Sequence, residues 1–180
     1  MKIQLLKPDL HQIDRVAADT FVAYVFEDER PPRGMAGLLD WRLCGTLSNL
    51  MLSGQVTGRL HEAVLLPSYG RAPTRRVCIY GLGPVGEFTA ARARECSQHA
   101  AQSLFRMRAE SFIGSLPGSP LTTLPARTRM EAFLEEVLRA FGGDTDGHDT
   151  AMFIVEPQGV HRDLTEVAAA IQKKIRATWR

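Results

Sequence analysis

The sequence has few cysteines and no long hydrophobic run, and each shortage excludes a class of protein. Three cysteines in 180 residues are too few for a disulfide scaffold. No stretch reaches the about 18 uncharged apolar residues of a membrane span, and the N-terminal segment lacks the apolar core of a secretory signal. With 44% hydrophobic and 23% charged residues, the composition is that of a globular domain. We therefore expect one cytoplasmic domain over residues 1–180, with Cys44, Cys78 and Cys96 as small core residues.

Lysine is also scarce, since 18 of the 22 basic residues are arginine and the net charge is only +2. The segment 71–129 holds nine arginines against three acids, a local charge of +6. Arginine suits fixed contacts to phosphate, so Arg71, Arg75 and Arg76 form a candidate nucleic-acid surface. The alternative is a solvated charged face. Aromatic residues are not interleaved with these arginines, so a stacking platform for single strands is not indicated.

Recognisable catalytic and metal motifs are missing as well. None of the five histidines is spaced from another histidine or a cysteine as metal ligands are, and neither His-Glu-x-x-His nor Gly-x-Ser-x-Gly occurs. The loop 142–149 groups three aspartates with His148, but the twelfth position of a calcium loop is Val155 instead of a carboxylate. Glu27, Asp28 and Glu29 indicate a surface salt-bridge loop beside Arg30 and Arg33. We expect no catalytic residue, no metal site and no cofactor.

Short apolar runs alternate with helical stripes along the chain. We expect strands at 3–6, 21–26, 63–67, 77–80, 111–114 and 151–155. Helices are expected at 9–18, 35–53 and 87–107, and two more begin at the capping boxes Thr128–Glu131 and Asp163–Glu166. This alternation predicts an α/β fold, with a mostly parallel sheet of about six strands covered on both sides.

Gly81, Leu82, Gly83 and Gly86 belong to a Gly-x-Gly-x-x-Gly run that leaves a strand and opens a helix. Such a turn lets the backbone approach a phosphate. A nicotinamide site is disfavoured, because the run follows the fourth strand instead of the first and Pro84 removes one N–H. A plain strand-to-helix turn and a looser nucleotide cradle, with the loop 116–125 as a flexible lid, both stay open.

A series of segments between residues 26 and 83 resembles the N-terminal domain of the leucyl aminopeptidases, which are two-metal peptidases. The segments that carry the resemblance are 26–34, 36–41, 45–47, 52–54, 57–58, 62–67 and 76–83. Two positions depart from the family pattern. His61 stands where a glycine is usual, and Pro84 stands where a lysine commonly follows Gly-Leu-Gly.

The resemblance implies a three-layer α/β/α, macrodomain-like fold. It also implies that catalysis is absent, because the family's metal ligands lie in a separate C-terminal domain whose Asn-Thr-Asp-Ala-Glu-Gly-Arg segment does not occur here. In that family the N-terminal domain lies outside the catalytic core of a hexamer, and in some members it contributes to nucleic-acid contact.

Three hypotheses about function follow. The first is a stand-alone, non-catalytic relative that binds a partner protein or forms a homo-oligomer. The second is a protein that binds a nucleotide or ADP-ribose at Gly81, Leu82, Gly83 and Gly86. The third is a module that binds duplex DNA through Arg71, Arg75 and Arg76.

Overall fold

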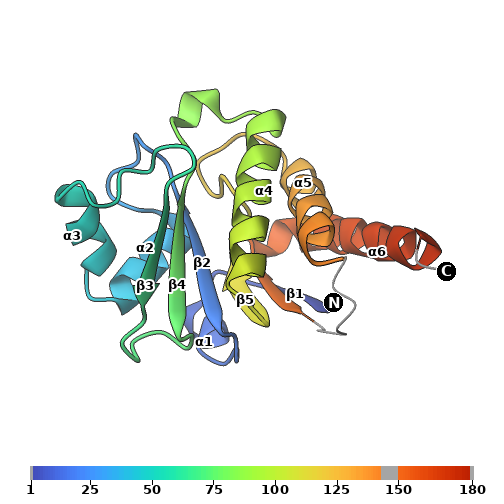
Figure 1. Ribbon diagram of the computed structural model, residues 1–180, viewed down its shortest axis with the longest axis horizontal. Coiled ribbons are helices and arrows are strands. Elements are labelled where there is room, and N and C mark those ends of the chain that lie inside the picture. The colour runs from blue at the N-terminus through green and yellow to red at the C-terminus, as the bar shows by residue number, and fades with distance from the viewer. Residues whose placement is uncertain (1, 143–149, 179–180) are drawn as a thin grey trace.

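A mixed sheet with strand order β1-β6-β5-β2-β4-β3 forms the middle of the molecule (Figure 1). The computed structural model describes residues 2–142 and 150–178, and side chains up to residue 173. All neighbouring strands in this sheet are parallel except the antiparallel pair β3 and β4, which confirms a mixed, mostly parallel sheet. The strands are β1 (Lys2–Leu6), β2 (Thr20–Val25), β3 (Ala63–Pro67), β4 (Arg76–Gly81), β5 (Ser111–Gly114) and β6 (Ala151–Val155).

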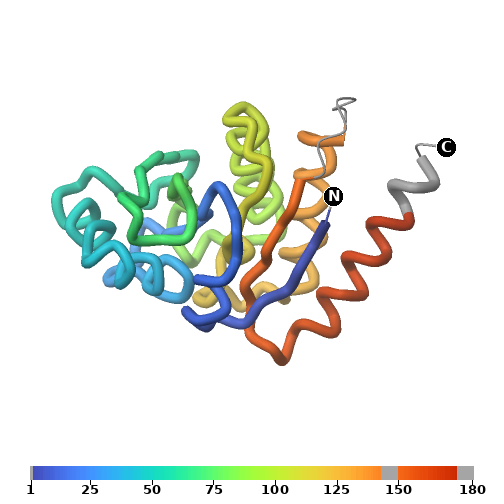
Figure 2. The backbone as a smooth tube through the Cα atoms, turned by 90° about the horizontal axis from the view of Figure 1, so that it is seen from below, coloured from blue at the N-terminus to red at the C-terminus, as the bar shows by residue number. Residues whose placement is uncertain are grey.

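Helices cover both faces of the sheet, so the fold has the three expected layers. One face carries α1 (Leu10–Ile13), α2 (Gly34–Arg42) and α3 (Thr46–Leu52). The other carries α4 (Ala90–Arg106), α5 (Ala126–Phe141) and α6 (His161–Thr178), with the 3-10 turns η1 (Val85–Glu87) before α4 and η2 (Gln158–Val160) before α6. Figure 2 shows β1 beside β6, although these strands come from opposite ends of the chain. None of the described helices is long and apolar enough to cross a membrane.

The core consists of two apolar layers, one on each face of the sheet. Every residue of β2 is buried, because helices cover both faces and the strand does not alternate between core and solvent. On the α4 side, the expected stripe packs against the sheet: Ala93, Cys96, Ala100 and Leu104 are buried, and Met107 is partly buried. Its small side chains let α4 approach the strands closely.

The helix expected at 35–53 is in fact two helices. Cys44 and Gly45 both have a positive φ, at 53° and 79°, which breaks the hydrogen-bonded ladder. The Asp40 carboxylate then accepts hydrogen bonds from the Ser48 N–H at 3.0 Å and the Ser48 hydroxyl at 2.5 Å, inside α3. The turn also leaves Cys44 exposed, so its assignment to the core is wrong, whereas Cys78 and Cys96 are buried.

Other predicted helix boundaries were also wrong. The first helix is only Leu10–Ile13, although Asp9 caps it as expected. Helix α5 begins after Pro125 without a side-chain cap, and α6 begins at His161 after a 3-10 turn. The Thr128 and Asp163 capping positions therefore lie inside their helices. Pro125 and Pro157, each with a φ of −55°, stand directly before these helical turns, which therefore begin ahead of the capping patterns.

Candidate functional site

The carboxyl ends of β5, β2 and β4 lie side by side at one end of the sheet and define the candidate site. The chain leaves β2 toward α2 on one face, and it leaves β4 and β5 toward α4 and α5 on the other. In open α/β sheets a ligand crevice lies where neighbouring strands connect to opposite faces. The structure thus places Gly81, Leu82, Gly83 and Gly86 beside the crevice that this topology predicts.

Most backbone donors of this glycine-rich turn already bond within the chain. The Leu82 N–H donates to the Val25 carbonyl at 3.0 Å, and the Val85 N–H donates to Oδ1 of Asp28 at 3.0 Å. The Gly81 and Gly83 N–H groups donate to the carbonyls of Glu62 and Gly58, both at 2.9 Å. An anion at this turn would have to displace these acceptors. Ligand binding by the four residues stays a prediction.

Packing alone accounts for glycine at position 81. A Cβ there would collide with the carbonyl oxygen of Arg59, which crosses over the end of β4. Gly86 differs, since it is exposed and a Cβ would meet nothing within 4 Å. A substitution at Gly86 therefore changes the turn without disturbing the sheet.

Three glutamates tie the surrounding loops together through backbone N–H groups. Glu62 accepts from the N–H groups of Thr57 at 2.9 Å and Gly58 at 2.7 Å. Glu29, which is buried, accepts from the N–H groups of Phe26 at 3.1 Å and Arg33 at 2.5 Å. Burial raises the pKa of Glu29, and these two hydrogen bonds oppose that shift. The interpretation of Glu29 as part of a surface salt-bridge loop is wrong, because its carboxylate is buried and accepts hydrogen bonds from the backbone.

The third glutamate, Glu156, follows β6 and is 1% exposed. It accepts from the Leu116 N–H at 2.9 Å and the Ser119 hydroxyl at 3.2 Å. The Arg129 guanidinium, also buried, reaches both carboxylate oxygens at 3.4 Å, and its Nε donates to the Leu124 carbonyl at 3.2 Å. One buried ion pair thus fixes the loop between β5 and α5 at both of its ends.

The chain's own side chains fill the crevice. The rings of Phe88 and Phe26 meet edge to face with centroids 5.3 Å apart. A Cβ on Gly118 would collide with the Phe88 ring, and one on Gly34 would press against Pro120 at 2.6 Å. The loop 116–125 is therefore packed between α2 and the β4–α4 turn, and the flexible lid expected there is instead an anchored segment.

Sequence reasoning missed the structural role of Glu62, Glu156 and Arg129. A signal was present for the two glutamates, since each stands next to an apolar strand, where an unpaired charge would be costly. No comparable signal marks Arg129, because only tertiary packing shows that one arginine of α5 turns inward.

His61 shows how the chain accommodates one departure from the family pattern. Its φ is +66°, in the left-handed region that favours glycine. Nε2 of its imidazole lies 2.9 Å from Oε1 of Glu95, and its ring meets that of His99 edge to face at 5.6 Å. Burial, followed by the nearby His61, lowers the pKa of His99. The side chain thus gains contacts to α4 that a glycine would not make.

The three arginines of the DNA hypothesis do not line a common cavity. Arg76 pairs with Oδ2 of Asp19 at 2.7 Å and donates to the Met107 carbonyl at 3.0 Å, so its charge is largely neutralised. Arg75 and Arg76 line one surface cavity, whereas Arg71 lines another. DNA binding stays a prediction.

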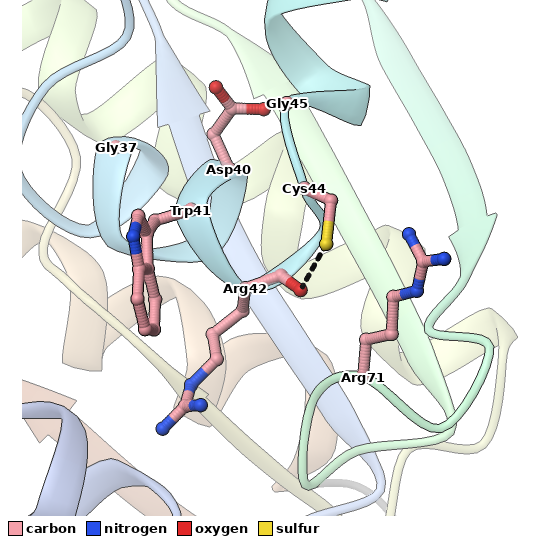
Figure 3. A pocket seen from close by; sticks show the side chains of 7 residues that line it. All are labelled: Gly37, Asp40, Trp41, Arg42, Cys44, Gly45 and Arg71. Carbon is pink, nitrogen blue, oxygen red and sulfur yellow. Dashed lines mark hydrogen bonds between the residues drawn. The ribbon is translucent and has the colours of Figure 1, made fainter.

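The cavity lined by Arg71 lies between α2, the turn at Cys44 and Gly45, and the β3–β4 loop, and has a volume of about 740 Å³ (Figure 3). Trp41, 65% exposed, stands at one side, with the Arg42 guanidinium over its ring at 5.2 Å. Cys44 and Asp40 complete the polar lining, but Asp40 is occupied by Ser48. The cavity is open to solvent, and its polar groups do not converge on a single point.

Within residues 2–142 and 150–178, no group of three or more histidine, cysteine, aspartate or glutamate side chains is placed to hold a metal ion. The loop with His148 and its three aspartates lies outside the described residues.

Comparison with known proteins agrees with this geometry. Residues 22–141 match the family model for the cytosol aminopeptidase family, N-terminal domain. A probable cytosol aminopeptidase of Geobacter sp. (strain M21) is 34% identical over 116 residues, which is 64% of this chain but 23% of that protein. The matched segment thus spans less than a quarter of its relative.

Solved structures show the same fold. A mutant of tomato leucine aminopeptidase superposes with a TM-score of 0.63 at 14% identity, over 93% of this chain and 35% of that one. The Trypanosoma brucei macrodomain in complex with ADP-ribose superposes with a TM-score of 0.72 at 16% identity, over 92% of this chain and 68% of that one. The fold is therefore macrodomain-like.

Replacing Arg129 with methionine tests the buried ion pair. We expect Arg129→Met to lower the free energy of unfolding by about 3–5 kcal/mol, because it leaves the buried Glu156 carboxylate without its counterion. Arg127→Met is the matched control: Arg127 lies on the same helix and pairs with Glu131 and Glu166 at the surface. That variant should lose only about 0–1 kcal/mol. Urea denaturation measures both, and equal losses would contradict the assigned role of Arg129.

Proposed function

The chain belongs to the cytosol aminopeptidase family, whose N-terminal domain it matches, and we propose that it is a non-catalytic, cytoplasmic member that works by binding a partner protein or further copies of itself. The proposal treats residues 1–180 as one functional unit. Residues 22–141 match only the N-terminal domain of the family. The family's metal ligands, as stated above, lie in its separate C-terminal domain.

The filled crevice carries this proposal. At the strand ends, where an α/β fold would hold a ligand, carboxylates of Asp28, Glu29, Glu62 and Glu156 already accept the backbone and side-chain donors. A phosphate would compete for the same N–H groups. The arrangement supports a structural role for the residues at the carboxyl ends of the strands. A partner would then bind on the outer surfaces of the protein.

Self-association is tested by size-exclusion chromatography with light scattering over a wide range of concentration. We expect the apparent mass to rise above that of the 19.9 kDa chain as concentration increases, because assembly is governed by mass action. A strict monomer at every concentration removes the self-assembly half of the proposal.

Peptidase activity is tested separately with leucyl amides and added zinc or manganese. We expect no hydrolysis above that of the metal alone, because no two-metal site is formed by the described residues. Metal-dependent turnover that is lost when one of the chain's own carboxylates or histidines is replaced would refute the non-catalytic reading.

A second candidate function is binding of ADP-ribose or a related nucleotide. It is favoured by the likeness to a macrodomain whose structure contains ADP-ribose, and by the open surroundings of Gly86. Calorimetry with ADP-ribose and ADP decides between the two. On the main proposal, any dissociation constant is weaker than about 1 mM. Tighter binding that Gly86→Asp abolishes without loss of stability would establish the nucleotide function instead.

A further inference from the structure

The free edge of β3 presents an uncharged, apolar strand whose outward hydrogen-bonding groups have no partner strand. Strand β3 ends the sheet, and only β4 pairs with it. The N–H of Gly81 donates to the carbonyl of Glu62, and the N–H of Ser68 donates to the carbonyl of Arg75. These two bonds show that the even-numbered residues face β4. The N–H and C=O groups of the odd-numbered residues therefore point outward.

Apart from Pro67, this edge lacks the usual protection against pairing with another chain. Residues 63–70 contain no charged side chain, whereas natural sheet edges commonly carry lysine or other charges. Leu65, at the centre of the strand, is 56% exposed, and Tyr69 beyond its end is 79% exposed. The opposite edge strand, β1, exposes Lys2 and Gln4 instead.

We infer that the β3 edge pairs antiparallel with the β3 edge of a second copy of this chain, around a two-fold axis at Leu65. This inference rests on the self-assembly half of the proposed function. In this register each Leu65 exchanges two hydrogen bonds with Leu65 of the other copy, and each Ala63 N–H donates to a Pro67 carbonyl, about four bonds in all. The pairing requires no hydrogen bond from the nitrogen of Pro67, which carries no hydrogen. It also places Tyr69 of each copy opposite His61 of the other.

The charges at the two ends of β3 favour this antiparallel arrangement. Near its start, the carboxylates of Glu27, Glu87 and Glu95 outnumber the guanidinium groups of Arg59 and Arg92, with which they form ion pairs. Beyond its end, Arg71 and Arg75 take part in none of the ion pairs found among the described residues. The cavity that Arg75 lines also holds Arg76, Arg108, Asp19 and Glu110, so this end carries more guanidinium groups than carboxylates. An antiparallel pair brings the more acidic end of one copy beside the basic end of the other. A two-fold interface of this kind satisfies both ends at once.

An edge-to-edge strand pair buries less surface than the about 800 Å² per partner of a standard interface. We therefore expect a reversible dimer in the micromolar range. The exposed side chain of Leu65 makes the strand accessible to substitution without loss of core packing.

Sedimentation velocity on the full chain tests the inference. Leu65→Lys should raise the dimer dissociation constant at least about tenfold, because it places two like charges across the axis. Gln4→Lys adds the same charge to the opposite edge strand and should leave the constant unchanged. Far-ultraviolet circular dichroism and thermal unfolding confirm that both variants are folded.

Cross-linking provides a second measurement. In a Cys44→Ser background, Leu65→Cys should form a covalent dimer with a short bifunctional maleimide, and Gln4→Cys should not, since the other two cysteines are buried. The β3 interface is overturned if Leu65→Lys leaves the dimer dissociation constant unchanged and Leu65→Cys cross-links no better than Gln4→Cys. Self-assembly through another surface would then still stand. A strict monomer overturns both.

Discussion

The carboxylate of Glu156 holds together the parts of the molecule that meet at the carboxyl ends of the strands. It accepts hydrogen bonds from Leu116 and Ser119 in the β5–α5 loop and pairs with the guanidinium of Arg129 in α5, so the end of β6, this loop and α5 all depend on one buried charge. A charge taken out of water is tolerated only where its hydrogen bonds are satisfied, and here the backbone and Arg129 satisfy them. Glu29 and Glu62 act in the same way on neighbouring loops. The loops at the carboxyl ends of the strands are thereby tied to one another.

The tight packing at the carboxyl ends of the strands affects which ligands the fold could bind. A macrodomain-like sheet offers a crevice at its topological switch point, and in this chain the crevice contains Phe26, Phe88 and the anchored loop. The chain's own carboxylates occupy donors that an anionic ligand would need. On the proposed function, recognition takes place on the outer surfaces, and among these the uncharged β3 edge is best suited to another polypeptide.

Several elements followed directly from local pattern. The strands at 63–67, 111–114 and 151–155 have the predicted bounds, because each is a short apolar run between polar or glycine-containing turns. The buried stripe of α4 also follows from its 3.6-residue period. The break between α2 and α3 was not predicted, since the apolar spacing of Leu39, Leu43 and Leu47 continues across it and all three are buried. A continuous stripe shows which side faces the core, but it does not show whether the backbone is continuous.

The sequence by itself determined the class of fold and the family, because strand and helix periodicity and the segments between residues 26 and 83 are local properties of the chain. Only the tertiary structure decided the state of the candidate site. Whether Glu29, Glu62 and Glu156 face solvent or hold loops depends on residues up to 40 positions apart. Burial and pairing of charge arise from the packing of distant segments, and no short pattern encodes them.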